Sequence, residues 1–253
     1  MTLWALEIEY DGRPFMGWQR QKHGLAIQQV VEEAAARVRG GAEVTEAVSA
    51  GRTDAGVHAM GMIVQIELPE LTPFRIREAM NFHLKPNPIV VLRCCPAPDG
   101  WNARFSATSR SYRYIISNRA VPPALEAGRV WHVRQKLDAG LMHDAAQTLL
   151  GHHDFSSFRA SACQAKSPMR TLDFLAVTRE GDKIYVETRA RSFLHHQVRN
   201  MVGSLVKVGE GSWPAPKLAE VLDAKSRAAA SVTAPAEGLY FTGVVYDPAL
   251  PLE

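Results

Sequence analysis

The spacing of apolar residues in the first part of the chain predicts alternating strands and helices. Residues 3–10 alternate between apolar and polar positions, which is typical of a half-buried strand. Residues 26–39 carry apolar side chains at helical spacing, and Gly40-Gly41 ends this pattern. The remaining predicted elements are strands at 44–50, 60–68 and 88–95 and a helix from the Thr72-Pro73 cap to about Leu84. The predicted order is β-α-β-β-α-β.

The rest of the chain repeats much of this order. A strand is predicted over 109–117, and a helix is predicted from an Asp138 cap to Leu150. The further predicted elements are strands at 171–179, 183–190 and 239–246 and helices at 194–208 and 217–222. This repeat predicts an α+β fold of two ferredoxin-like units whose mainly antiparallel sheets flank a central catalytic cleft. Turn residues concentrate at 96–100, so the predicted domains are 1–98 and 99–253.

The composition is typical of a globular enzyme and favours one cellular compartment. The chain has 253 residues, of which 46% are hydrophobic and 22% charged, enough for two domains. The N-terminus has no basic start, and no apolar run is long enough to span a membrane, so we expect a cytoplasmic protein without a signal peptide. The three cysteines form neither a disulfide framework nor a zinc motif, and the pairs His152-His153 and His195-His196 point to different faces. We therefore expect no metal.

Basic residues gather in three segments that contain no acid, although the net charge is only +3. Such segments suit a polyanionic partner, and the alternative is that acids nearby in space neutralise them. Aromatic residues interleave with the first segment, where bases can stack on rings while guanidinium groups hold phosphates. The segments are 100–125 with Arg104, Arg110, Arg113 and Arg119, 155–172 with Arg159, Lys166 and Arg170, and 188–209 with Arg189, Arg191, Arg199 and Lys207.

The sequence from Gly51 to His58 places one carboxylate, Asp54, on a turn between strands. An Asp before Ala-Gly commonly accepts a local backbone hydrogen bond, which is the alternative to a chemical role. Two observations favour a catalytic role for Asp54. In an extended chain Arg52 shares a face with Asp54, and a paired carboxylate stays ionised and nucleophilic. In addition, the sequence contains no other nucleophile motif, P-loop or dinucleotide fingerprint. Asp54 is therefore the predicted nucleophile.

Two other segments carry candidate side chains. Strand alternation places Arg110, Tyr112 and Tyr114 on one face, where Tyr114 is predicted to be a core residue and Tyr112 to stack on a base. In the predicted helix after Phe193, the residues His196, Arg199 and Gly203 lie on a face beside the apolar stripe. Arg199 can pair with Asp54 or bind phosphate, and Gly203 can allow close approach of a ligand or of a packed segment.

Six sets of residues in fixed order resemble the motifs of the tRNA pseudouridine synthase A (TruA) family. The resemblance covers nearly the whole chain and agrees with the two-unit α+β architecture. The chain departs from the family pattern at Lys85-Pro86-Asn87-Pro88 and at Asn102, where a His is common. The matching residues are Tyr10-Asp11-Gly12 with Phe15, Gly17-Trp18-Gln19 and Gln21, then Gly51 to Ala59, Ala103 to Ala107, Tyr112, His153-Asp154-Phe155 with Phe158, and Ser192 to Gly203.

The resemblance implies an isomerase that converts uridine to pseudouridine at positions 38, 39 and 40 of the tRNA anticodon stem-loop. No cofactor or metal is implied, and the family acts as a homodimer. Asp54 is implied to be the nucleophile, attacking the ribose or the base or abstracting a ribose proton. Tyr112 is implied to stack on the target base and Arg199 to pair with Asp54. The predicted site residues are Asp54, Arg52 and Arg199 for catalysis and Tyr112, Arg104, Arg110, His58 and His196 for substrate binding.

Two other classes of protein compete with this interpretation. A non-catalytic RNA-binding protein built on two RRM-like sheets would explain the basic segments and the aromatic strand, but not Arg52-Thr53-Asp54. A hydrolase of phosphate esters with an Asp nucleophile would need metal-binding carboxylates, such as a DxD pair, and the sequence has none.

Overall fold

The chain folds into two compact units. The computed structural model describes residues 1–41 and 45–253. Unit 1 consists of Met1–Arg110 together with Tyr240–Glu253, and unit 2 consists of Ser111–Leu239. Both units combine helices with mostly antiparallel strands, so the fold is α+β as predicted. The units differ from the predicted domains 1–98 and 99–253, because the last strand of the chain pairs with a strand of unit 1.

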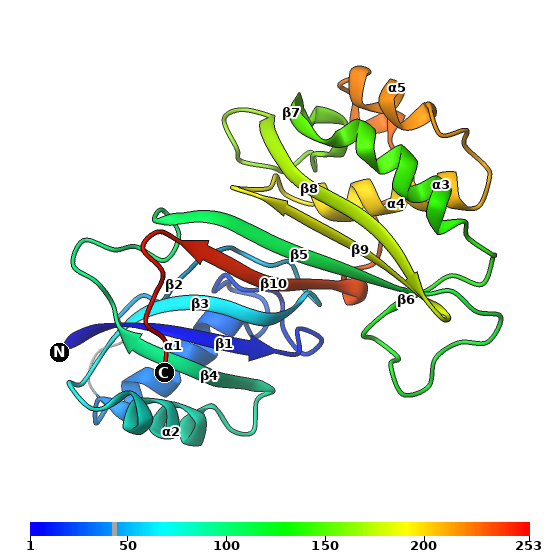
Figure 1. Ribbon diagram of the computed structural model, residues 1–253. Coiled ribbons are helices and arrows are strands. Elements are labelled where there is room, and N and C mark those ends of the chain that lie inside the picture. The colour runs from blue at the N-terminus through cyan, green and yellow to red at the C-terminus, as the bar shows by residue number, and fades with distance from the viewer. Residues whose placement is uncertain (42–44) are drawn as a thin grey trace. The chain divides into compact units, whose positions relative to one another are not determined.

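Unit 1 is built on a sheet in which the central strands are long and buried. Strand β1 (Thr2–Tyr10) pairs antiparallel with β3 (His58–Leu68) on one side and with β4 (Ile89–Pro96) on the other. Strands β2 (Val48–Ser49) and β10 (Leu239–Tyr246) both pair with β3. Helices α1 (Ile27–Val38) and α2 (Pro73–Leu84) cover one face (Figure 1).

The apolar periodicity explains this arrangement. Along β1, residues Trp4, Leu6 and Ile8 are buried at alternate positions. On the opposite face Ala5 is buried as well, whereas Glu9 is exposed. Helix α1 buries Ile27, Val30 and Val31 at helical spacing. Helix α2 begins where predicted, because the Thr72 hydroxyl accepts a hydrogen bond from the Arg75 N–H.

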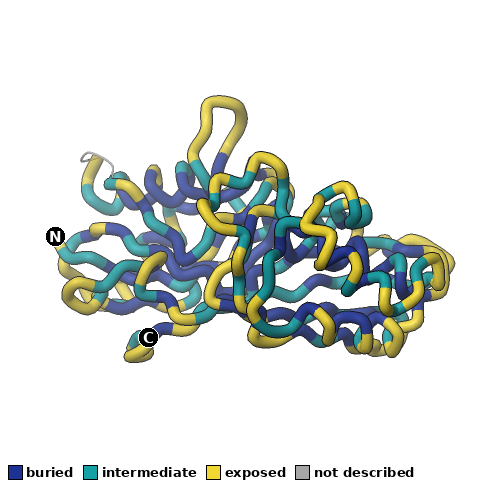
Figure 2. The backbone as a smooth tube through the Cα atoms, turned by 90° about the horizontal axis from the view of Figure 1, so that it is seen from above, coloured by how far each residue is buried: buried dark blue, intermediate teal, exposed yellow. Residues whose placement is uncertain are grey.

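Unit 2 has a sheet with its helices gathered on one face. Its strands run in the order β5 (Ala107–Ser117, of which Ser111 onward lies in this unit), β9 (Lys183–Ala190), β8 (Met169–Glu180) and β7 (Gly151–Asp154), and β6 (Trp131–His132) pairs with β5. The helices are α3 (Ala139–Ala146), α4 (Gln197–Gly209) and α5 (Lys217–Asp223). Figure 2 colours the backbone by burial, and its projecting loops are exposed.

Several predicted elements have different limits in the structure. The helix predicted from Asp138 does start at that cap, but α3 ends at Ala146 and a 3₁₀ turn, η1 (Gln147–Leu149), precedes the unpredicted strand β7. The predicted strand 44–50 is only β2, and Val44 lies outside the described residues. Within the described chain no helix is long and apolar enough to cross a membrane.

Candidate active site

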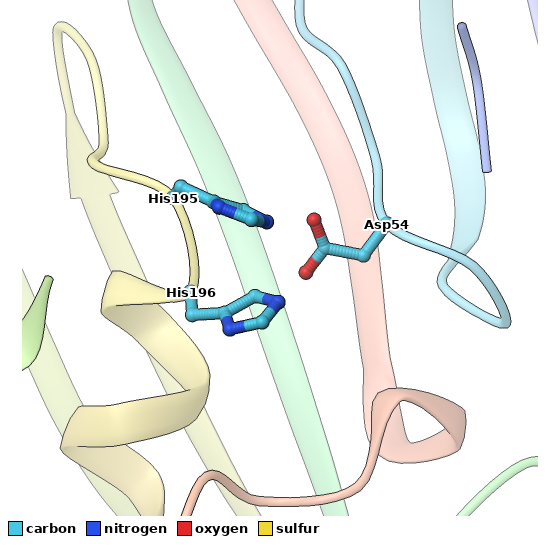
Figure 3. Close-up of side chains that lie close together, drawn as sticks. All are labelled: Asp54, His195 and His196. Atoms are coloured by element: carbon cyan, nitrogen blue, oxygen red, sulfur yellow. The ribbon is translucent and has the colours of Figure 1, made fainter. Parts of the chain in front are cut away.

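Asp54 lies on the loop between β2 and β3 (Figure 3), and the backbone of a second loop packs against this turn. The turn is closed by the Val57 N–H, which donates to the Asp54 carbonyl at 3.1 Å. Gly17 has a φ of +90°, and a Cβ there would lie 2.7 Å from the Thr53 carbonyl oxygen. Gly12 faces the Val57 carbonyl even more closely. Only glycine permits this contact of two backbones, so the loop from Asp11 to Trp18 fixes the turn.

Hydrogen bonds hold the same turn at its sides. The Tyr10 hydroxyl bonds the Thr53 hydroxyl at 2.8 Å, and the Trp18 N–H donates to the Thr53 carbonyl at 3.0 Å. On the other side, Arg110 Nε donates to the Ala50 carbonyl at 2.8 Å. Asp54 itself is half-buried, while its neighbour Thr53 is buried. The backbone that carries the carboxylate is thus restrained on both sides, which is what a positioned reactive group requires.

Two predicted cations lie near this turn in unit 1. Arg52 and Arg104 are both exposed. Burial of part of its side chain, together with the positive charge of Arg52, lowers the pKa of Arg104. Two arginines that repel each other are stabilised by an anion between them. Asn102, one of the departures from the family pattern, shapes this region, because its Oδ1 accepts hydrogen bonds from the backbone N–H groups of Arg104 and Phe105.

Two residues predicted to bind substrate are buried within unit 1. Arg110 is 8% exposed, and besides Ala50 its guanidinium donates to the carbonyls of Ala107 and Arg104. His58 is 3% exposed; its Nδ1 accepts from the Gly12 N–H at 3.1 Å and its ring stacks on Tyr240. Both side chains therefore help to hold the backbone of unit 1, and their contact with substrate stays a prediction.

In unit 2, Tyr112 lies half-buried, and its ring makes a T-shaped contact with Phe193. The ring centroids are 5.1 Å apart and the planes are nearly perpendicular, so this contact fixes the tilt of the Tyr112 ring. Tyr114 is fully buried, as predicted, and its hydroxyl donates to the Pro235 carbonyl at 2.7 Å. Burial raises the pKa of Tyr114 well above its usual value.

The turn before α4 presents two histidine rings. Figure 3 shows His195 and His196 side by side, and their ring centroids are 4.0 Å apart. His196 has a φ of 61°, a left-handed conformation that is unusual outside glycine and frequent at functional sites. The structure stabilises this turn because the Gln197 side chain accepts from the Leu194 N–H and the Ala160 N–H donates to the His195 carbonyl. Helix α4 therefore starts at Gln197, three residues later than predicted.

Arg199 leaves the first turn of α4 and contacts a backbone segment of unit 2. Its Nε donates to the Ala234 carbonyl at 2.8 Å, and the Ala234 N–H donates to the Arg199 carbonyl at 3.1 Å. One turn later, a Cβ at Gly203 would collide with the Val232 carbonyl. Gly203 therefore serves helix packing, which was one of the two alternatives that the sequence left open.

Some cations of the basic segments form ion pairs with acids, and others are exposed at the surface. We call the first group neutralised and the second group available to an anionic partner. Arg113 pairs with Glu187, Arg119 with Asp182 and Lys207 with Glu210, as the alternative interpretation expected. Arg159 and Arg170 donate to loop carbonyls. Arg189 is exposed, and its guanidinium lies over the Phe174 ring in a cation–π contact.

Gly12, Gly17 and Tyr10 belong to the first set of residues that resembles the family, but the sequence did not predict that they support the Asp54 turn. The motif Tyr10-Asp11-Gly12 looks like an ordinary strand-ending turn, and Phe15 and Trp18 are indeed buried packing residues. A sequence shows that a glycine is present, but not which backbone approaches it from a segment forty residues away.

Comparison with known proteins identifies the family of this chain. The family model of tRNA pseudouridine synthase matches residues 7–106 and 145–247. A tRNA pseudouridine synthase A of Acidiphilium cryptum is 57% identical over 249 residues, covering 98% of this chain and 97% of the relative. Proteins of the same name from Rhodospirillum centenum and Zymomonas mobilis are 56% and 52% identical over 247 residues each, and each match covers 97% of this chain and 100% of the relative. The chain therefore belongs to the tRNA pseudouridine synthase family, isomerases that convert uridine of tRNA to pseudouridine.

Proposed function

We propose that this protein isomerises uridine at positions 38, 39 and 40 of the tRNA anticodon stem-loop, with Asp54 as the nucleophile. The observation that carries the proposal is the support of the Asp54 turn by Gly12, Gly17 and the Tyr10–Thr53 hydrogen bond. Contacts that only glycine permits hold this turn against another backbone segment, and such restraint is what a positioned reactive group requires.

The reaction is an isomerisation and balances without a redox partner. The bond from uracil N1 to ribose C1′ breaks, the base rotates, and C5 bonds C1′ while the C5 proton leaves and N1 gains a proton. Asp54 starts this sequence by attack on the ribose or the base or by removal of a ribose proton. In this proposal Tyr112 stacks on the target base and Arg199 assists catalysis, while His196, whose left-handed backbone projects the ring from the start of α4, contacts the RNA.

Positive charge beside the turn supports binding of RNA. Positions 39 and 40 lie in a stem, so the target nucleotide must be extruded at a cost of a few kcal/mol. Arg52 and Arg104 are exposed cations on the surface of unit 1, and phosphate contacts there help to offset this cost. Recognition through phosphates reads the shape of tRNA more than its base sequence, which agrees with activity at three adjacent positions.

The test measures tritium release from tRNA transcripts labelled at uridine C5, because joining C5 to C1′ must expel that hydrogen. Asp54→Asn keeps the shape of the side chain and should reduce release by at least about 10³-fold while tRNA binding stays within about twofold. The matched control is Asp144→Asn, the same change on an exposed position of α3, which should release tritium like the wild type.

Transcripts with a single labelled uridine at position 38, 39 or 40 test the choice of position. Release from all three is expected, and release only from uridines elsewhere in the tRNA would contradict the positional assignment. Wild-type release by Asp54→Asn would contradict the nucleophile and leave the enzyme activity in place.

We also propose two properties of the whole protein. Each unit is ferredoxin-like, a proposal supported in unit 1 by the element order β1-α1-β2-β3-α2-β4. The protein is a cytoplasmic homodimer that binds one tRNA across both subunits, as the family resemblance implies. Light scattering on a size-exclusion column tests the dimer: a mass near twice 27.9 kDa is expected, and a monomer that retains full activity would contradict it.

A further inference from the structure

A segment of unit 2 lies along helix α4 and is anchored at both ends. We call residues 226–238 the strap. At its start, the Ser226 N–H donates to the Ser157 hydroxyl at 2.9 Å, and Ser157 is fully buried. At its end, the Pro235 carbonyl accepts from the Tyr114 hydroxyl, and Gly238 lies so close to the Tyr114 ring that a Cβ would be 2.6 Å from it. The strap therefore connects the core of unit 2 to strand β5, which carries Tyr112.

Between its ends the strap is attached to α4 through a buried polar cluster around Asn200. Asn200 is fully buried. Its Oδ1 accepts from the Thr233 hydroxyl at 2.7 Å and from Arg227 Nη2 at 3.2 Å, and its Nδ2 donates to the Phe158 carbonyl at 2.8 Å. These three hydrogen bonds of the Asn200 side chain are directional, so the cluster fixes the position of Thr233 relative to α4.

Residue 233 is adjacent to the partner of Arg199. Ala234 both accepts from Arg199 Nε and donates to the Arg199 carbonyl. A displacement of Thr233 would move the Ala234 carbonyl and with it the guanidinium that the carbonyl orients. Gly203 brings the strap into direct backbone contact with α4, so the two cannot slide without breaking these bonds.

We propose that Asn200 and Thr233 are positioning residues that hold the Arg199 guanidinium through the strap. This inference rests on the proposed function, in which Arg199 assists catalysis. Neither Asn200 nor Thr233 needs to touch the RNA; they act by fixing the Ala234 carbonyl. A shift of about 1 Å in a catalytic group can cost on the order of a hundredfold in rate, so loss of one bond in the cluster should reduce kcat while leaving the KM for tRNA almost unchanged.

The test compares three variants of the full-length protein by steady-state tritium release at a series of tRNA concentrations, which gives kcat and KM, and by tRNA binding and thermal unfolding. Thr233→Val removes the hydroxyl that bonds Asn200, and Thr233→Ser keeps a hydroxyl at that position. Thr188→Val is the matched control, because the buried Thr188 hydroxyl on β9 donates to the Phe174 carbonyl at 3.0 Å and the residue lies outside the strap. Both valine variants should lower Tm by about 2–4 °C.

The expected result is a roughly tenfold or greater loss of kcat in Thr233→Val alone, with recovery in Thr233→Ser and wild-type kcat in Thr188→Val. Equal kcat in the two valine variants, or a loss in Thr233→Val that appears only as a higher KM, would overturn the inference.

Arg199→Ala separates this result from the proposed function. If Arg199→Ala loses activity while Thr233→Val keeps it, the positioning role is wrong and the role of Arg199 stands. Wild-type activity in Arg199→Ala would instead remove Arg199 from the proposed mechanism, and any loss in Thr233→Val would then have to act on another group, which also overturns the inference.

Discussion

At the scale of single residues, glycine is required where two backbone segments meet behind Asp54. Gly17 has a φ of +90° and lies against the Asp54 turn. A side chain at this position would therefore strain the backbone and also clash with the turn. The Asp54 carboxylate depends on this contact for its position, because the Thr53 carbonyl that Gly17 faces is one residue away.

We expect Gly17→Ala to lower the free energy of unfolding by about 1–3 kcal/mol and to reduce tritium release more than its stability loss explains. Gly243→Ala is the control, because Gly243 lies in β10 of the same unit and a Cβ there would contact nothing within 4 Å. Chemical denaturation and single-turnover release measure the two effects. Equal activity in both variants would show that the contact with Thr53 does not position the turn.

The three cysteines should differ sharply in reactivity. Burial raises the pKa of Cys94 to about 11 and raises that of Cys95, and both side chains are buried. Burial opposes ionisation of Cys163 as well, but hydrogen bonds from the backbone of Ala165 and His195 and the charge of Arg159 outweigh it and lower its pKa. The thiolate is the reactive form.

An aromatic disulfide reagent at pH 7.5 should therefore modify one thiol quickly in the native protein. Cys163→Ser should abolish the fast phase, while Cys94→Ser should leave it unchanged. A fast phase that survives Cys163→Ser would contradict the difference in pKa.

At the scale of elements, the periodicity of apolar residues predicted most strands and helices to within a few residues. Helix α2 and its Thr72 cap follow from local rules, and so does the Asp138 cap. The start of α4 does not, because Leu194 fits the helical spacing yet precedes the left-handed His196. That conformation is held by Gln197 and by Ala160, and the latter contact comes from a distant loop that no local pattern contains.

The candidate site was also predicted only in part, because tertiary contacts decide which of its side chains are buried. Asp54 and Tyr112 were predicted from chemical type and strand alternation, and Tyr114 was confirmed as a core residue. Arg110 and His58 have the right chemistry for RNA, but tertiary structure buries both of them. Burial depends on what packs against a strand, so residue type alone overestimates the number of exposed cations.

The short 3₁₀ turn η2 (Ser156–Phe158) should be sensitive to acid. Asp154 accepts from Ser156, and this hydrogen bond lowers the pKa of the Asp154 carboxyl in the folded protein. Because the folded pKa lies below the unfolded value, the folded state binds fewer protons, and the stabilisation is complete above the unfolded pKa and is lost as pH falls through the folded one.

The Tm of the wild type should therefore exceed that of Asp154→Asn at pH 6, and the difference should shrink as the pH falls toward 3. A difference that does not depend on pH would assign the effect to packing and not to the charge of Asp154. Thermal scans in a series of buffers of equal ionic strength measure it.

At the scale of the whole molecule, the formal net charge of +3 is too small to bind tRNA by itself. Binding must come from local groups of cations that are exposed and have no acidic partner among residues 1–41 and 45–253, such as Arg104. Arg113, in contrast, pairs with Glu187. Each phosphate contact contributes about 0.7–0.9 to the slope of log K against log salt.

Arg104→Gln should reduce the slope for tRNA binding by about one. Arg113→Gln removes the same formal charge from an ion pair and should change the slope much less. Filter binding between 50 and 300 mM KCl measures both, and equal slopes for the two variants would contradict the division into neutralised and available cations.

The discontinuity of unit 1 sets an order of events during synthesis. The chain leaves unit 1 at Arg110 and returns to it at Tyr240, so β10 and the backbone bonds between Glu253 and Cys94 are made by residues at the end of the chain. Domains usually fold in the order in which they emerge from the ribosome. Here unit 2 is continuous and emerges complete while unit 1 still lacks its last strand, so the part of the protein that is translated first is the part that finishes folding last.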